Sequence, residues 1–96
     1  AMLVSVSAGR GGRYPITEMR GYSYKNTQVN YIPQHVIIDH VNKVLNDMEP
    51  SSEDKADGFI KDKIQYSLRL LEQYGKALKI VRESGVVDLE KHPYGM

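Results

Sequence analysis

Seven positions in the second half of the chain constrain its fold more than any other feature of the sequence. Alternating steps of four and three residues separate Ile60, Ile64, Ser67, Leu71, Tyr74, Leu78 and Val81. This spacing keeps one stripe of an α-helix facing the same neighbour for about three heptads. It predicts one long helix, from about residue 53 to residue 84, that lies against another helix over most of its length.

The ends of this helix carry start and stop signals. Ser51 or Ser52 can cap the first turn, and the pair Ser84-Gly85 can end the last one. Gly75 lies inside the predicted helix and lowers its stability by roughly 0.5 to 1 kcal/mol relative to alanine, so it is interpreted as the mark of a close helix crossing.

A shorter helix is predicted from residue 34 to residue 48. Pro33 suits a first-turn position, and the residues after it place a second apolar set on one face, namely Ile37, Val41, Val44, Leu45 and Met48. Pro50 separates the two helices. The predicted fold is therefore mainly α, an antiparallel helical hairpin, with the two hairpins of a homodimer forming a four-helix bundle.

The first 33 residues follow a different pattern, and residues 2–33 are predicted to form an extended, partly β arm. Residues 3–6 read as a short strand, and the tyrosine-rich stretch 22–31 also favours extended chain. The arm, 2–33, and the hairpin with its short tail, 34–96, are treated as one domain overall. The arm carries a net charge of +3, because it holds Arg10, Arg13, Arg20 and Lys25 against one acid, Glu18.

Composition narrows the function classes. The chain has 96 residues, a formal net charge of +1 and no cysteine, which argues against a disulfide framework and against a thiolate nucleophile or metal site. No stretch has the length of a membrane span, so a cytoplasmic protein is expected. His35, Asp39 and His40 are too few ligands for a zinc site, and neither a metal nor a cofactor is predicted.

The glycine-rich run from Gly9 to Arg13 has the composition of a phosphate-binding loop but lacks its predicted context. Such loops join a strand to a helix, and the residues after Arg13 are predicted to be extended. The run is therefore interpreted as a flexible linker.

These features favour a non-enzymatic interaction or assembly module, whose partners are a second copy of itself and another protein. The residues predicted to form the oligomer seam are Ile60, Ile64, Leu71, Tyr74, Leu78 and Val81. In the arm, the predicted partner contacts are Arg10, Arg13, Tyr22 and Tyr24.

Two other classes stay open. A strand followed by a short helix and a serine-capped second helix is similar in element order to ribbon-helix-helix repressors, which place a two-stranded ribbon in the DNA major groove. That likeness implies a dimeric DNA- or RNA-binding regulator with Gln28 and Asn30 as the base contacts. The acids Glu53, Asp54 and Asp57 oppose it, because they repel phosphate at that helix end. A small enzyme is the third class, and no catalytic residue is predicted for it.

Overall fold

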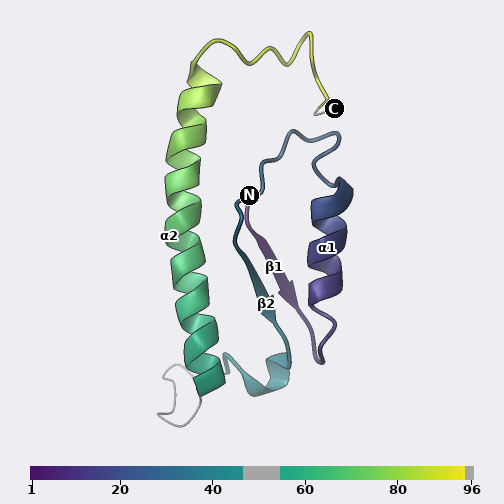
Figure 1. Ribbon diagram of the computed structural model, residues 1–96, viewed down its shortest axis with the longest axis vertical. Helices are drawn as coiled ribbons and strands as arrows, with labels where there is room; N and C mark the ends of the chain where they lie inside the picture. Colours follow the sequence, from purple (N-terminus) through teal and green to yellow (C-terminus); the bar gives the residue numbers. More distant parts are fainter. Residues whose placement is uncertain (47–54, 95–96) are drawn as a thin grey trace.

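The computed structural model, which describes residues 1–46 and 55–94, is a mixed α/β structure in which two strands lie between two helices (Figure 1). Its elements follow the chain as β1 (Leu3–Val6), α1 (Arg13–Tyr22), β2 (His35–Ile38), the 3₁₀-helix η1 (Val41–Lys43) and α2 (Lys55–Glu83). The two strands are parallel and form one sheet. The prediction of a mainly α hairpin bundle is therefore wrong.

Two sequence segments account for this difference. Residues 35–38, predicted to lie in a helix, form β2, because the β-branched run Val36, Ile37, Ile38 favours the pleated, buried setting of a strand. The prediction rested on a set spaced at helical intervals, and short apolar runs of this kind fit either period. The last two residues of that predicted helix, 47 and 48, lie outside the described residues.

The N-terminal arm is also not extended throughout, because α1 occupies Arg13–Tyr22. Pro15 falls within the first turn, where its missing N–H costs nothing, and Arg20 lies in the last turn, where a cation is favourable. The strand predicted for residues 3–6 is confirmed as β1. With α1 as the connection, β1, α1 and β2 form a βαβ unit.

The register of the sheet assigns one face to each helix. Val4 pairs with Val36, Ser5 with Ile37 and Val6 with Ile38. A Cβ atom placed on Gly12, just before α1, would lie 2.8 Å from Ile37 Cγ2 and 3.0 Å from Ser5 Oγ, so α1 starts above the gap between the strands on that face.

The opposite face carries the main core and α2. Val36, Ile38 and Val44 are buried there, and Ile60 and Ile64 of α2 pack against them. The long helix predicted over 53–84 is observed as α2, although residues 53 and 54 are not described. Its neighbour is a strand and not a helix, since an apolar stripe can cover a sheet as well as another helix.

The helix α2 passes through Gly75 without a break. A Cβ atom at Gly75 would meet nothing within 4 Å. The interpretation of this glycine as a close helix crossing is therefore wrong.

The molecule is elongated. It measures 54 × 25 × 16 Å, with a radius of gyration of 16.8 Å. A compact domain of this length has a radius of gyration of about 12.5 Å. Figure 1 shows the cause, because α2 continues well beyond the end of the strands.

Candidate interaction surface

The predicted seam divides into two halves of different environment. Ile60 and Ile64 lie against the sheet, and Ser67 is fully buried. Farther along α2, Tyr74 is 40% exposed and Val81 52% exposed, and Leu71 and Leu78 are partly exposed. The first half of the seam thus belongs to the core of one chain, and the second half, Leu71, Tyr74, Leu78 and Val81, forms what we call the outer stripe.

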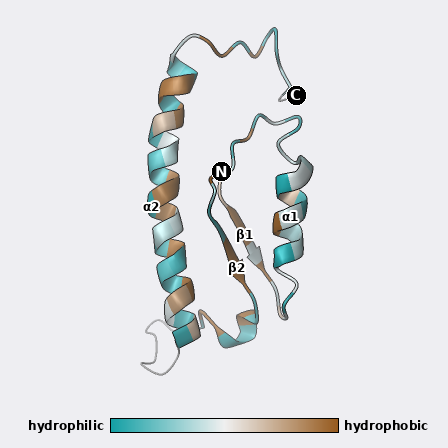
Figure 2. Ribbon diagram, viewed as in Figure 1, coloured by the Kyte–Doolittle hydropathy of each residue, from teal (hydrophilic) through white to brown (hydrophobic). Residues whose placement is uncertain are grey.

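Figure 2 shows hydrophobic positions that recur, between hydrophilic ones, along the part of α2 that continues beyond the strands. Two apolar side chains of the tail, Val87 and Leu89, are exposed and lie beside Leu78 and Val81, because all four line one groove. Exposed apolar side chains that gather in this way are typical of a site that contacts another protein.

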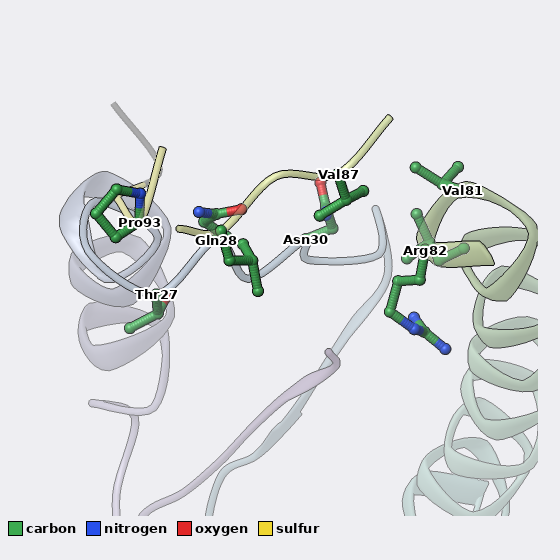
Figure 3. Close-up of a pocket in the computed structure, with 9 residues that line it drawn as sticks. Thr27, Gln28, Asn30, Val81, Arg82, Val87 and Pro93 are labelled. Atoms are coloured by element: carbon green, nitrogen blue, oxygen red, sulfur yellow. The ribbon is translucent and has the colours of Figure 1, made fainter. Parts of the chain in front are cut away.

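A groove of about 440 Å³ runs beside the outer stripe. One wall is α2, and the other is formed by the loop after α1 and by the C-terminal tail (Figure 3). The lining residues are Thr27, Gln28, Asn30, Leu78, Val81, Arg82, Val87, Leu89 and Pro93.

The tail is held against this loop. Gln28 Nε2 donates a hydrogen bond to the carbonyl oxygen of His92 over 2.9 Å. The tail thereby crosses from the end of α2 towards α1, as the yellow segment of Figure 1 shows. The groove therefore depends on a contact between residues 64 positions apart in the sequence.

Gln28 and Asn30 do not lie in a two-stranded ribbon of the kind that ribbon-helix-helix proteins have. Both residues lie in a loop, and Gln28 has the left-handed φ of 53°. The strands of the described chain are parallel and flank a helix, whereas the predicted ribbon needs paired strands that carry these two residues. The likeness in element order is therefore superficial.

The arm residues proposed as partner contacts lie at opposite ends of α1. Arg10 and Arg13 border an open hollow with Tyr14, Asp39 and His40. Tyr22 is the last residue of α1 and donates a hydrogen bond to Glu18 Oε1 over 3.0 Å, an interaction that raises the pKa of the phenol. Tyr24 lines a separate hollow with Gln28 and Asn30. The structure thus groups the two arginines and separates them from the tyrosines.

The glycine-rich run joins β1 to α1, so the interpretation of it as a linker with no helix after it is wrong. The carboxylate of Asp39, the residue after β2, accepts hydrogen bonds from Ser7 Oγ over 2.8 Å and from the Gly12 amide over 3.2 Å. Arg13 Nη2 lies 3.9 Å from its other oxygen. Asp39 therefore already occupies the place beside the α1 N-terminus that an external anion would take.

These contacts lower the pKa of Asp39. The hydrogen bond from Ser7 is the largest cause, and the Gly12 amide and the Arg13 charge act in the same direction. The carboxylate is thus kept ionised, and it fastens the glycine-rich loop to the end of β2.

Two histidines were weighed as metal ligands. His35 begins β2 and His40 follows it, so Asp39 and His40 lie at one end of the strand and His35 at the other. Burial is the largest cause of a lowered pKa at His35, followed by the charges of Arg20 and Lys63. Across residues 1–46 and 55–94, no three histidine or carboxylate side chains form a group that could hold a metal ion.

The sequence prediction missed one exposed feature, the outward-facing side of β1. Val4 is 49% exposed and Val6 is 57% exposed, although their partners Val36 and Ile38 are buried beneath α2. The sequence of residues 3–6 does not reveal this exposure, because it does not say which face of the sheet α2 covers. On that face α2 covers β2 and leaves β1 exposed.

Among the described helices, none combines the length and apolar character needed to cross a membrane. Comparison with known proteins finds no family model, no curated protein and no solved structure that matches this chain.

Proposed function

We propose that this chain is a non-enzymatic assembly module that associates with a second copy of itself through the outer stripe of α2. The observation that carries the proposal is an excess of exposed surface. The chain exposes 7453 Å². A compact monomer of 10.9 kDa exposes about 5,600 Å², so about 1,900 Å² is in excess.

The size of this excess fits an interface. A stable protein–protein contact buries about 800 Å² on each partner. The excess is large enough for such a contact, and the outer stripe provides the apolar centre that an interface needs.

The geometry favours two α2 helices that cross in opposite directions about a twofold axis. Such an interface is self-complementary, so each stripe residue meets its counterpart on the other side of the axis. An axis near residue 76 brings Leu71 opposite the partner's Val81, and Tyr74 opposite the partner's Leu78. The groove beside the stripe gives the partner's apolar side chains a place to enter.

The test is the mass in solution of the wild-type chain and of a Leu78→Asp variant. Light scattering after gel filtration should give twice 10.9 kDa for the wild type and 10.9 kDa for Leu78→Asp. The variant places a charge at the centre of the stripe, where it would be buried without a partner. Gln73→Asp, on an exposed part of the same helix, is the matched control and should keep the dimer mass. A wild-type mass of one chain contradicts the proposal.

A nucleic-acid regulator is the competing class. It lacks a ribbon in the described chain, and its predicted contact Gln28 is already bonded to His92. Binding to mixed DNA and RNA at low salt, with a steep loss as salt rises, would favour that class over the assembly module.

A further inference from the structure

The outer edge of β1 is an unpaired strand edge. Both backbone groups of Ser7 point towards β2, because its N–H donates to Ile38 over 2.9 Å and its C=O accepts from Val41 over 3.1 Å. Successive residues of a strand direct their backbone groups to opposite edges. The N–H and C=O groups of Val4 and Val6 therefore point away from β2.

Nothing in the described chain pairs with that edge. Within residues 1–46 and 55–94, no residue donates to or accepts from Val4 or Val6 on the side away from β2. The strand sequence Leu-Val-Ser-Val also lacks the lysine, proline or charged residue with which proteins usually protect an open edge. The edge can thus accept another extended chain.

The two faces next to this edge differ in character. On the α2 side, Val4 and Val6 present half-exposed apolar side chains. On the α1 side, Arg10 and Arg13 border one hollow with Asp39. Asp39 lies 3.9 Å from Arg13, whose side chain is 67% exposed, so the two arginines outnumber the one carboxylate there. A strand that pairs here would meet an apolar face on one side and a basic end on the other.

We propose that the free edge of β1 binds an extended segment of a partner protein in which apolar and acidic residues alternate. Residues alternate between the faces of a strand, so the apolar side chains would lie beside Val4 and Val6 and the acidic ones on the α1 side. Backbone hydrogen bonds supply affinity, and the alternating side chains supply specificity.

Charge favours such a segment over a second copy of β1. Between Leu3 and His40 the chain carries four basic residues, Arg10, Arg13, Arg20 and Lys25, against two acids, Glu18 and Asp39. Arg20 bonds to the carbonyl oxygens of Ile32 and Pro33, just before β2, so it lies at the opposite end of the strand pair from Arg13. Two copies of β1 paired about a twofold axis would bring the basic end of each towards Arg20 of the other, which is unfavourable.

The test uses a synthetic peptide, acetyl-Val-Glu-Val-Glu-Val-Glu-Val-amide, titrated into the ¹⁵N-labelled chain. The amide signals of Val4 and Val6 should shift and become protected from hydrogen exchange. Two control peptides hold the length constant: one has lysine in place of every glutamate, and the other has proline in place of the valine at its third position. Both should bind at least about 10-fold more weakly, because one reverses the charge and the other removes a backbone donor.

Variants of the chain test the same contacts from the other side. Val6→Pro removes the outward N–H, a change tolerated on an edge strand, and should abolish the shifts at Val4. Arg10→Glu should weaken binding about 10-fold, whereas Lys25→Glu, an equal charge change beyond the other end of α1, should weaken it less than about 3-fold. If Val6→Pro does not fold, the control peptides still test strand pairing, because they are added to the unaltered chain.

Three results would overturn the proposal. The first is that the amide signals of Val4 and Val6 do not change at 1 mM peptide, which is about the limit of weak binding. The second is that the lysine or the proline peptide binds as tightly as the glutamate peptide. The third is that both amides are protected in the free chain and that this protection rises with protein concentration. The last would mean that a second copy holds the edge. Peptide binding should persist in Leu78→Asp, so failure of the proposed assembly and failure of this site can be told apart.

Discussion

Among the described glycines, Gly12 has the least room for a side chain. A Cβ atom there would lie 2.8 Å from Ile37 Cγ2, 2.9 Å from Asp39 Oδ1 and 3.0 Å from Ser5 Oγ. Two of these atoms belong to β2 and to the residue that follows it, so they cannot both move away freely. The close approach of α1 to the sheet therefore requires glycine at this position.

We expect Gly12→Ala to lower the free energy of unfolding by about 1 to 3 kcal/mol, the usual cost of overpacking. Urea denaturation measures this change. Gly11→Ala is the matched control, because a Cβ atom there would meet nothing within 4 Å. Equal stability of the two variants would mean that α1 does not sit this close to β2.

Asp39 gives a prediction about pH. Its pKa is lowered in the folded chain, so its contribution to stability is fully present above the ordinary carboxyl pKa of 3.8 and is lost as the pH falls through the folded value. Asp39→Asn should therefore be less stable than the wild type at pH 7, and the difference should shrink below pH 3.8.

Thermal unfolding of both proteins from pH 7 to pH 2 measures this dependence. Asp62→Asn, which alters an exposed carboxylate on α2, is the control and should show no comparable gap at pH 7. A gap for Asp39→Asn that stays constant down to the lowest pH would contradict the assigned hydrogen bonds.

The residues of this loop were only partly predictable. Gly9, Arg10 and Arg13 stand out in the sequence as a glycine-rich basic run. Nothing local indicates that Asp39, 27 positions after Gly12, closes the loop, because that contact exists only once β1 and β2 are parallel neighbours.

At the scale of an element, α2 carries a polar group at its best-buried position. Ser67 has no exposed surface, and its hydroxyl finds no hydrogen-bond partner among the described residues. A buried hydroxyl without a partner costs about 1 to 3 kcal/mol. Ser67 nevertheless occupies one of the positions, spaced by four and three residues, that are otherwise apolar.

We therefore expect Ser67→Ala to raise the free energy of unfolding by about 1 kcal/mol, since it removes this cost and improves helix propensity. Urea denaturation measures the difference. Gln73→Ala, at an exposed position of the same helix, is the control for helix propensity and should change stability by less than about 0.5 kcal/mol. A loss of stability in Ser67→Ala would mean that the hydroxyl has a partner in solution.

The sequence predicted α2 and β1 correctly, and it missed β2 and α1. The stripe of α2 repeats over three heptads, so its helix could be identified from the sequence. The run His35–Ile38 is too short to distinguish helix from strand by period, and its strand conformation depends on pairing with β1, 32 residues earlier. Within α1 only Ile16 is buried, so no apolar stripe indicated a helix there.

At the scale of the whole molecule, the main result is that other parts of the chain cover only one portion of α2. The predicted hairpin pairs a helix over 34–48 with one over 53–84, about twice as long, so within one chain about half of the long helix would have no helical neighbour. The structure replaces the hairpin by a sheet, which covers the part of α2 around Ile60 and Ile64. The part around Leu78 and Val81 stays partly exposed, and the proposed self-association rests on this exposure and not on the predicted hairpin.

The edge of β1 adds a second unpaired feature on another side of the molecule. A sheet of two parallel strands leaves one edge of each strand open, and parallel sheets are usually larger and covered on both faces. Under the two proposals, the outer stripe of α2 binds a second copy of the chain, and the open edge of β1 binds a segment of a partner protein.

Sedimentation equilibrium of the cysteine-free chain, over protein concentrations from 5 µM to 500 µM (chosen to span about the range of weak to moderate affinity), tests the central claim of self-association most directly. We predict that a single-species fit at the upper concentrations gives twice the chain mass of 10.9 kDa. A mass of 10.9 kDa throughout this range would contradict it, because the surface of the outer stripe would then remain in contact with water.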